Sequence, residues 1–153
     1  MTDDREILGD VPLGKLNGSC VLVVDDDEEI RLFLATLLTD EGAAVLQAAD
    51  GEQAVETAAR ARPDLITLDL SMPGKDGIET FCELRGNPAT EDTPVCIITG
   101  YPEYRKLIYD RPVSPPEGFI NKPCDPDHVV TTIRRILTLG KRKRARTSRY
   151  VRP

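Results

Sequence analysis

Five short runs of apolar residues recur along the chain, and each is apolar throughout instead of alternating with polar positions. Runs of this kind predict strands that are covered on both faces, as in a parallel sheet. The runs are CVLVV at 20–24, AAVLQA at 43–48, DLITLDL at 64–70, PVCIIT at 94–99 and GFIN at 118–121.

The segments between these runs have helical periodicity. After the first run the apolar positions are spaced i, i+3, i+4, i+7, i+8, and Gly42 follows where a C-terminal cap would end the helix. Asp50 with Gln53, and Asp76 with Glu79, have the spacing of capping boxes that open two further helices. The apolar stripe of the first helix consists of Ile30, Phe33, Leu34, Leu37 and Leu38.

The last helix opens at Asp125-Pro126, an N-cap acid followed by proline in the first turn. The fourth helix is expected to be short, over 102–110, because Pro112, Pro115 and Pro116 bar its continuation. Its inward residues are expected to be Tyr104, Leu107 and Ile108, and those of the last helix Val129, Thr132, Ile133, Ile136 and Leu137.

Strand and helix thus alternate five times, which predicts a doubly wound α/β fold with ligands at the carboxyl ends of the strands. The residues at those ends are the candidates for function. They are Asp25, Asp26 and Asp27 after the first run, Asp69 in the third, Thr99 in the fourth and Lys122 after the fifth.

Clustered carboxylates repel one another unless a cation neutralises them or they are protonated. Oxygen ligands without nitrogen or sulfur favour a hard ion, and Mg²⁺ is the first choice. Each residue also has a plain structural interpretation: the three acids can cap a helix, Asp69 can belong to a turn, and Thr99 and Lys122 can be ordinary strand-end residues. Their occurrence together at one sheet edge favours function.

Such a set can perform phosphoryl transfer to a carboxylate. A carboxylate attacks phosphorus if a metal and a cation cover the charge on the transferring oxygens and a hydroxyl orients them. In this scheme Asp69 is the nucleophile, Asp26 a metal ligand, Lys122 the cation and Thr99 the hydroxyl.

The segments VLVVDDDEEIR, PDLITLDLSMPGKDG, VCIITG and FINKP resemble the receiver domain of bacterial two-component response regulators, over about residues 20–139. The resemblance implies a CheY-like, flavodoxin-like fold: a five-stranded parallel sheet of strand order 2-1-3-4-5, here with an atypically short fourth helix. It also implies a signalling domain that catalyses only its own phosphorylation and dephosphorylation.

By this resemblance Asp69 is the phosphoacceptor, and Asp25 and Asp26 are the acidic pair that binds Mg²⁺ together with Asp69 and the Ser71 carbonyl. Within the pair, Asp26 would be a direct ligand and Asp25 would act largely through water. The alignment of the apolar residues favours this pair over a register shifted by one along the three aspartates. Lys122 matches the phosphate-binding lysine, preceding a cis bond to Pro123. Thr99 and Phe119 match the switch hydroxyl and the switch aromatic residue.

The resemblance also implies the class of protein that donates the phosphoryl group, but it does not identify the downstream target. The phosphoryl donor would be a histidine kinase or a histidine phosphotransfer protein, since the chain's sole histidine, His128, is expected to be a cap or surface residue. The downstream target is expected to be a protein of unknown identity, contacted by a stand-alone regulator. Gly100-Tyr101-Pro102 and the stretch RPVSPPEG depart from the family pattern, which affects the output surface and not the chemistry.

Charge divides the 153-residue chain into an acidic body and a basic end. The net charge is −6, yet residues 141–152 hold seven Lys or Arg and no acid, which leaves 13 bases against 26 acids in the rest. Nucleic-acid binding is therefore expected to be weak and confined to this tail. The predicted organisation is a loose N-terminal extension over 1–19, the receiver domain over 20–139 and a basic tail over 140–153.

Four cysteines without metal-binding spacing fit a reduced, cytoplasmic compartment, and neither a signal peptide nor a membrane span is expected. Two other functions remain as alternatives. An aspartate-nucleophile phosphatase would carry a second acid two residues after the nucleophile, where this chain has Ser71. A nucleotide-binding flavodoxin-like domain would cradle phosphate in its first turn, where DDDEE would repel it.

Overall fold

The computed structural model describes residues 14–72 and 76–150, with side chains described as far as residue 140. Five parallel strands form one sheet in the order β2-β1-β3-β4-β5, which confirms the predicted topology. The strands are β1 (Cys20–Val24), β2 (Ala44–Ala48), β3 (Leu65–Leu68), β4 (Val95–Thr99) and β5 (Gly118–Asn121).

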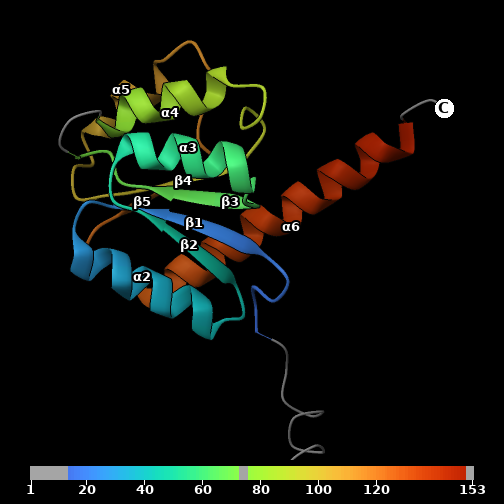
Figure 1. The fold of residues 1–153 in the computed structure, drawn as a ribbon, viewed down its shortest axis with the longest axis horizontal. Coiled ribbons are helices and arrows are strands. Elements are labelled where there is room, and N and C mark those ends of the chain that lie inside the picture. The colour runs from blue at the N-terminus through green and yellow to red at the C-terminus, as the bar shows by residue number, and fades with distance from the viewer. Residues whose placement is uncertain (1–13, 73–75, 151–153) are drawn as a thin grey trace, which may run out of the picture.

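Helices cover both faces of this sheet (Figure 1). On one face lie α2 (Glu28–Asp40) and α6 (Pro126–Tyr150); on the other lie α3 (Gly51–Ala61), α4 (Gly77–Gly86) and α5 (Tyr104–Tyr109). Each face has its own apolar cluster, because the central strands send alternate side chains to opposite sides. Val21 and Val23 pack towards α2 and α6, whereas Leu22 and Val24 pack towards α3 and α4.

The predicted N-caps form, although Gln53 Oε1 accepts the Ala49 N–H at 2.9 Å and not the Asp50 N–H that a capping box would use. Asp27, Asp50 and Asp76 are N-caps whose carboxylates accept hydrogen bonds from backbone N–H groups of the first turn. Asp125 does the same for α6, since it accepts from the His128 N–H at 3.2 Å. Gly42, just past α2, has a φ of +97°, a left-handed conformation that favours glycine.

Two of the expected inward residues point elsewhere. Phe33 on α2 is 44% exposed, and Leu107 on α5 is 49% exposed, so the apolar spacing overestimated how much of each helix is covered. Ile108 is the buried residue of α5, as expected. The helix itself spans only Tyr104–Tyr109, which confirms the atypical fourth helix.

The two ends of the domain differ from the sequence expectation. Leu16 is buried in the core and its N–H donates to the Glu41 carbonyl at 2.9 Å, so residues 14–19 pack on the domain instead of forming a loose extension; residues 1–13 lie outside the described part. At the other end, α6 does not stop near 139 but continues as one helix to Tyr150. Among the described residues, no helix has the length and apolarity needed to cross a bilayer.

Candidate functional site

Two central strands place the acidic side chains. β1 and β3 are neighbours in the middle of the sheet, so the residues that follow them emerge side by side at the carboxyl edge. The Asp69 N–H donates to the Val24 carbonyl at 3.1 Å, and the Asp25 N–H donates to the Ala48 carbonyl at 3.2 Å. These bonds extend the sheet by one residue on each strand and fix the backbone of both aspartates.

The carboxylates of Asp25, Asp26 and Asp69 gather in one cluster, with an oxygen from each within 4.8 Å of the others. Asp25 and Asp69 are buried, at 1% and 5% exposure, whereas Asp26 is exposed. The expected set of acids is therefore brought together in space. Asp27, the third aspartate of the run, is the N-cap of α2: its carboxylate accepts hydrogen bonds from the first turn of that helix and does not belong to the cluster.

Lys122 brings the only charge of opposite sign recorded against these buried acids in the described part of the chain. Its Nζ lies 2.8 Å from Asp25 Oδ2 and 3.6 Å from Asp69 Oδ2. The backbone holds it there, because the Lys122 N–H donates to the Thr99 carbonyl at 2.8 Å. The bond between Lys122 and Pro123 is cis, as predicted. The lysine thus reaches across from β5 to the acids that follow β1 and β3.

Burial dominates the electrostatics of Asp69. It raises the pKa of Asp69 to about 6; Lys122 opposes this rise, while the neighbouring charges of Asp25 and Asp26 add to it. For Lys122, burial lowers the pKa, but the hydrogen bond to Asp25 and the charges of Asp69 and Asp25 outweigh it, so the pKa is raised overall. Lys122 therefore stays protonated, and its single positive charge only partly compensates the negative charge of the neighbouring carboxylates.

The donor set fits a divalent hard cation. Three carboxylates face one ammonium group, so the cluster keeps an excess of negative charge. Carboxylate oxygens without nitrogen or sulfur ligands suit Mg²⁺. Asp69 is further oriented by the Ser71 N–H, which donates to its Oδ1 at 3.3 Å.

Thr99 and Phe119 lie on the adjacent strands. Thr99 is fully buried at the end of β4, and its hydroxyl oxygen accepts the Tyr101 N–H at 3.2 Å. Phe119, on β5, is half-buried against the α3–α4–α5 cluster, and the Arg105 guanidinium lies 5.3 Å from its ring centroid. Thr99 therefore ends its strand at the same sheet edge as the acids, whereas Phe119 pairs with Ile97, two residues further from that edge.

Sequence reasoning missed two supports of this site. Arg31 Nη1 donates to the Asp25 carbonyl at 2.8 Å and its Nε to Gln47 Oε1 at 3.2 Å, which ties α2 to the ends of β1 and β2. Gly77 opens α4 directly against the backbone of Asp69 and Leu70, where any Cβ would clash. The Asp76 N-cap was visible in the sequence, but this close approach was not.

A third missed feature anchors the proline-rich segment. Arg85 of α4 is buried beside Phe81, and its guanidinium donates to the carbonyls of Thr93, Ser114 and Pro115 at 2.7–3.1 Å. It also pairs with Glu117 at 2.8 Å, whose carboxylate accepts the Val95 N–H. An arginine in the last turn of a helix usually reads as a solvated cation, so no sequence signal pointed to this role.

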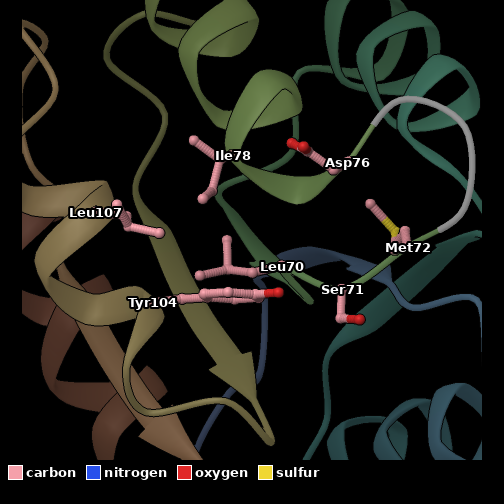
Figure 2. Close-up of a pocket in the computed structure, with 7 residues that line it drawn as sticks. All are labelled: Leu70, Ser71, Met72, Asp76, Ile78, Tyr104 and Leu107. Carbon is pink, nitrogen blue, oxygen red and sulfur yellow. The ribbon is translucent and has the colours of Figure 1, made fainter.

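An open hollow of about 320 Å³ lies beside the loop that follows Asp69 (Figure 2). Its walls come from that loop, from the start of α4 and from α5, so it adjoins the acidic cluster without containing it. The lining residues are Leu70, Ser71, Met72, Asp76, Ile78, Tyr104 and Leu107.

Comparisons with known proteins give a consistent result. The family model of the response regulator receiver domain matches residues 21–134. Sporulation initiation phosphotransferase F of Bacillus subtilis is 34% identical over 119 residues, which cover 78% of this chain and 94% of that protein. The transcriptional regulatory protein ResD of the same organism is also 34% identical, over 82% of this chain but only 50% of its own length.

Solved structures agree with these relatives. Chemotaxis protein CheY4 of Vibrio cholerae superposes with a TM-score of 0.69 at 32% identity, covering 77% of this chain and 98% of that one. NtrX of Brucella abortus superposes with a TM-score of 0.75 at 29% identity, covering 85% of this chain and 29% of that one. The likeness thus spans whole single-domain relatives and only one part of larger regulators.

Proposed function

Because the chain belongs to the response regulator receiver domain family, we propose that Asp69 accepts a phosphoryl group from the phosphohistidine of a kinase or a phosphotransfer protein. The observation that carries this assignment is the meeting of Asp25, Asp26 and Asp69 with Lys122 at one sheet edge. We take residues 20–139 as the phosphoacceptor domain, and the cytoplasm, where a histidine kinase presents its phosphohistidine, as its compartment.

The transfer needs an ionised Asp69. With a pKa of about 6, its carboxylate is mostly deprotonated at neutral pH. An Oδ atom then attacks phosphorus, the new O–P bond forms as the N–P bond of the donor breaks, and the donor imidazole leaves with the bonding electron pair. The Ser71 N–H keeps the carboxylate in a fixed orientation during this step.

Two sets of residues would stabilise the negative charge on the oxygens of the transferred phosphoryl group. The Nζ of Lys122 lies 3.6 Å from Asp69 Oδ2, so it can form an ion pair with the oxygens of a phosphoryl group attached to Asp69. Asp25, Asp26, Asp69 and the Ser71 carbonyl would hold Mg²⁺, which supplies positive charge to the same oxygens when bound. Asp25 also sets the starting position of Lys122 through their 2.8 Å contact.

The signal would leave through Thr99 and Phe119. A phosphoryl oxygen competes with the Tyr101 N–H for the Thr99 hydroxyl, and loss of that bond loosens the segment that begins at Gly100. Phe119, half-buried under Arg105, can then turn towards the space that Thr99 leaves. The output is read by a protein partner on the surface around residues 100–118.

The hydrogen bonds of Arg85 limit which part of residues 100–118 can move. Arg85 fixes Ser114 and Pro115 to α4, so the proline-rich half of the segment is held by part-buried hydrogen bonds that do not involve Asp69. The part without such an anchor is 100–111, which contains α5 and the exposed Tyr101 and Leu107. We therefore place the moving surface at 100–111 and treat 112–118 as its fixed border.

The test is phosphorylation by a small-molecule donor. The protein is incubated with acetyl phosphate and Mg²⁺, and the mass increase of one phosphoryl group is followed by intact mass spectrometry. Asp69→Asn should abolish it, while Asp40→Asn, an exposed acid at the end of α2, should leave it unchanged. Equal incorporation by Asp69→Asn and the parent would show that another residue is the acceptor.

A further inference from the structure

The second half of α6 leaves the domain as a free-standing helix. Its first half is fixed by Val129, Ile133 and Ile136, which are buried in the core. Gly140 still lies beside the rest of the domain, since a Cβ there would be 4.0 Å from Cγ of Pro94. Beyond it α6 continues to Tyr150 and projects away from the sheet and its helices (Figure 1). At 1.5 Å per residue, 141–150 extend about 15 Å further.

This projecting helix carries the opposite charge to the rest of the chain. Residues 141–152 contain seven Lys or Arg and no acid, against 13 bases and 26 acids elsewhere. The basic character begins on the domain itself, because Arg134 and Arg135 are exposed on α6. Both line a shallow hollow with Thr131, Thr138 and Leu139, and neither forms an ion pair with another described residue.

The composition of the helix decides which anionic partner it suits. A helix that lies in a membrane surface, or docks in a groove of another protein, needs an apolar stripe at i, i+3, i+4 and i+7. Residues 141–150 are charged or carry a hydroxyl group, except for Ala145, and Tyr150 is their one aromatic residue. The sequence of this segment therefore offers no apolar stripe. A nucleic-acid backbone needs no apolar contact, because Lys and Arg bind its phosphates by charge alone.

We propose that α6 beyond Gly140, together with Arg134 and Arg135, is a binding site for the phosphate backbone of a nucleic-acid duplex. The end of α6 projects away from the acidic body (Figure 1), whose negative charge would otherwise repel a polyanion. A major groove admits an α-helix, and a continuous basic helix can follow it without a separate reading domain. The site binds the phosphate groups without recognising the base sequence, and its binding does not depend on the phosphorylation of Asp69.

The size of the contact sets its salt dependence. A duplex carries one phosphate per about 1.7 Å of its axis, so a helix of about 15 Å lies along roughly nine phosphates, counting both strands. If about five of them are neutralised, the affinity should fall by about 100- to 1,000-fold between about 50 and 200 mM salt. Such steep dependence distinguishes this mode from a contact made by base-edge hydrogen bonds.

The experiment measures binding of the full chain to a fluorescent 20-base-pair duplex by anisotropy, at several salt concentrations and with two unrelated sequences. The test variant replaces Lys141, Arg142, Lys143 and Arg144 by Gln, a good helix former, and circular dichroism checks that helix content is kept. The matched control replaces four exposed bases of the body by Gln, which removes the same net charge. These are Lys15, Arg60, Lys106 and Arg111.

The expected result is at least a tenfold loss of affinity in the test variant, little change in the control and the steep salt dependence given above. Arg134→Gln with Arg135→Gln should weaken binding further, and Asp69→Asn should not change it, so failure of the phosphoryl chemistry would not be mistaken for failure here. Equal losses in test and control variants, salt-resistant or sequence-selective binding, no binding at about 50 mM salt, or tighter binding to vesicles of anionic lipid would each overturn the proposal.

Discussion

Replacing Asp69 by Asn should stabilise the protein at neutral pH in the absence of metal, and the gain should vanish in acid. The folded protein holds Asp69 at a pKa of about 6, against an ordinary value of 3.8. The folded state therefore favours the protonated carboxyl. Its contribution to stability is present at low pH and is lost as the pH rises from about 4 through about 6.

The magnitude follows from that difference. At about 1.4 kcal/mol per pH unit, ionising Asp69 costs the folded protein about 3 kcal/mol by neutral pH. Asn keeps the shape and can still accept the Ser71 N–H through its Oδ1, but it has no charge to bury. Its amide N–H₂ can face Lys122 Nζ, which lies 3.6 Å from Asp69 Oδ2, so the net gain should be smaller, about 1–3 kcal/mol.

The assay is urea unfolding of parent and variant at about pH 4 and about pH 7.5, with a chelator present. The variant should exceed the parent by about 1–3 kcal/mol at the higher pH and match it at the lower one. Asp40→Asn, an exposed acid far from the cluster, should show no such pH-dependent gain. A difference between variant and parent that is the same at both pH values would refute the assignment of buried charge to Asp69.

Three further predictions concern the metal, the output surface and the Arg85 anchor. Mg²⁺ should raise the unfolding temperature of the parent modestly, and Asp26→Ala should remove most of that rise; equal shifts measured by thermal unfolding would argue against Asp26 as a ligand. In hydrogen-exchange mass spectrometry, amides of 100–111 should exchange faster than those of 112–118 and slow when Asp69 is phosphorylated. Arg85→Ala should destabilise the protein by about 1–3 kcal/mol, because three part-buried carbonyls lose their donor and Glu117 keeps only the Val95 N–H, and should reduce the protection of 112–118; unchanged exchange there would contradict the anchor.

Much of the fold could be predicted because its signals are local. Unbroken apolar runs identified the five strands, and Asp50, Asp76 and Asp125 marked three helix starts through hydrogen bonds that span three residues of chain. The acidic site was also predictable, since parallel strands must place their carboxyl ends, and hence Asp25 and Asp69, at one edge. Periodicity failed for Phe33 and Leu107, because it records which side of a helix is apolar but not how far the neighbouring elements extend over it.

Only the tertiary structure decided how these parts constrain one another. The Arg85 anchor joins residues 29 to 32 positions apart in the chain, and its donors meet backbone carbonyls, which every residue possesses and no sequence pattern marks. The clash-free approach of Gly77 to Asp69 and the burial that raises the pKa of Asp69 likewise depend on distances between separate elements. The sequence by itself determined which groups meet at the sheet edge, because strand order and direction suffice for that. How deeply they are buried, and which segment beside them stays free to move, follows from packing, which no single segment of the chain encodes.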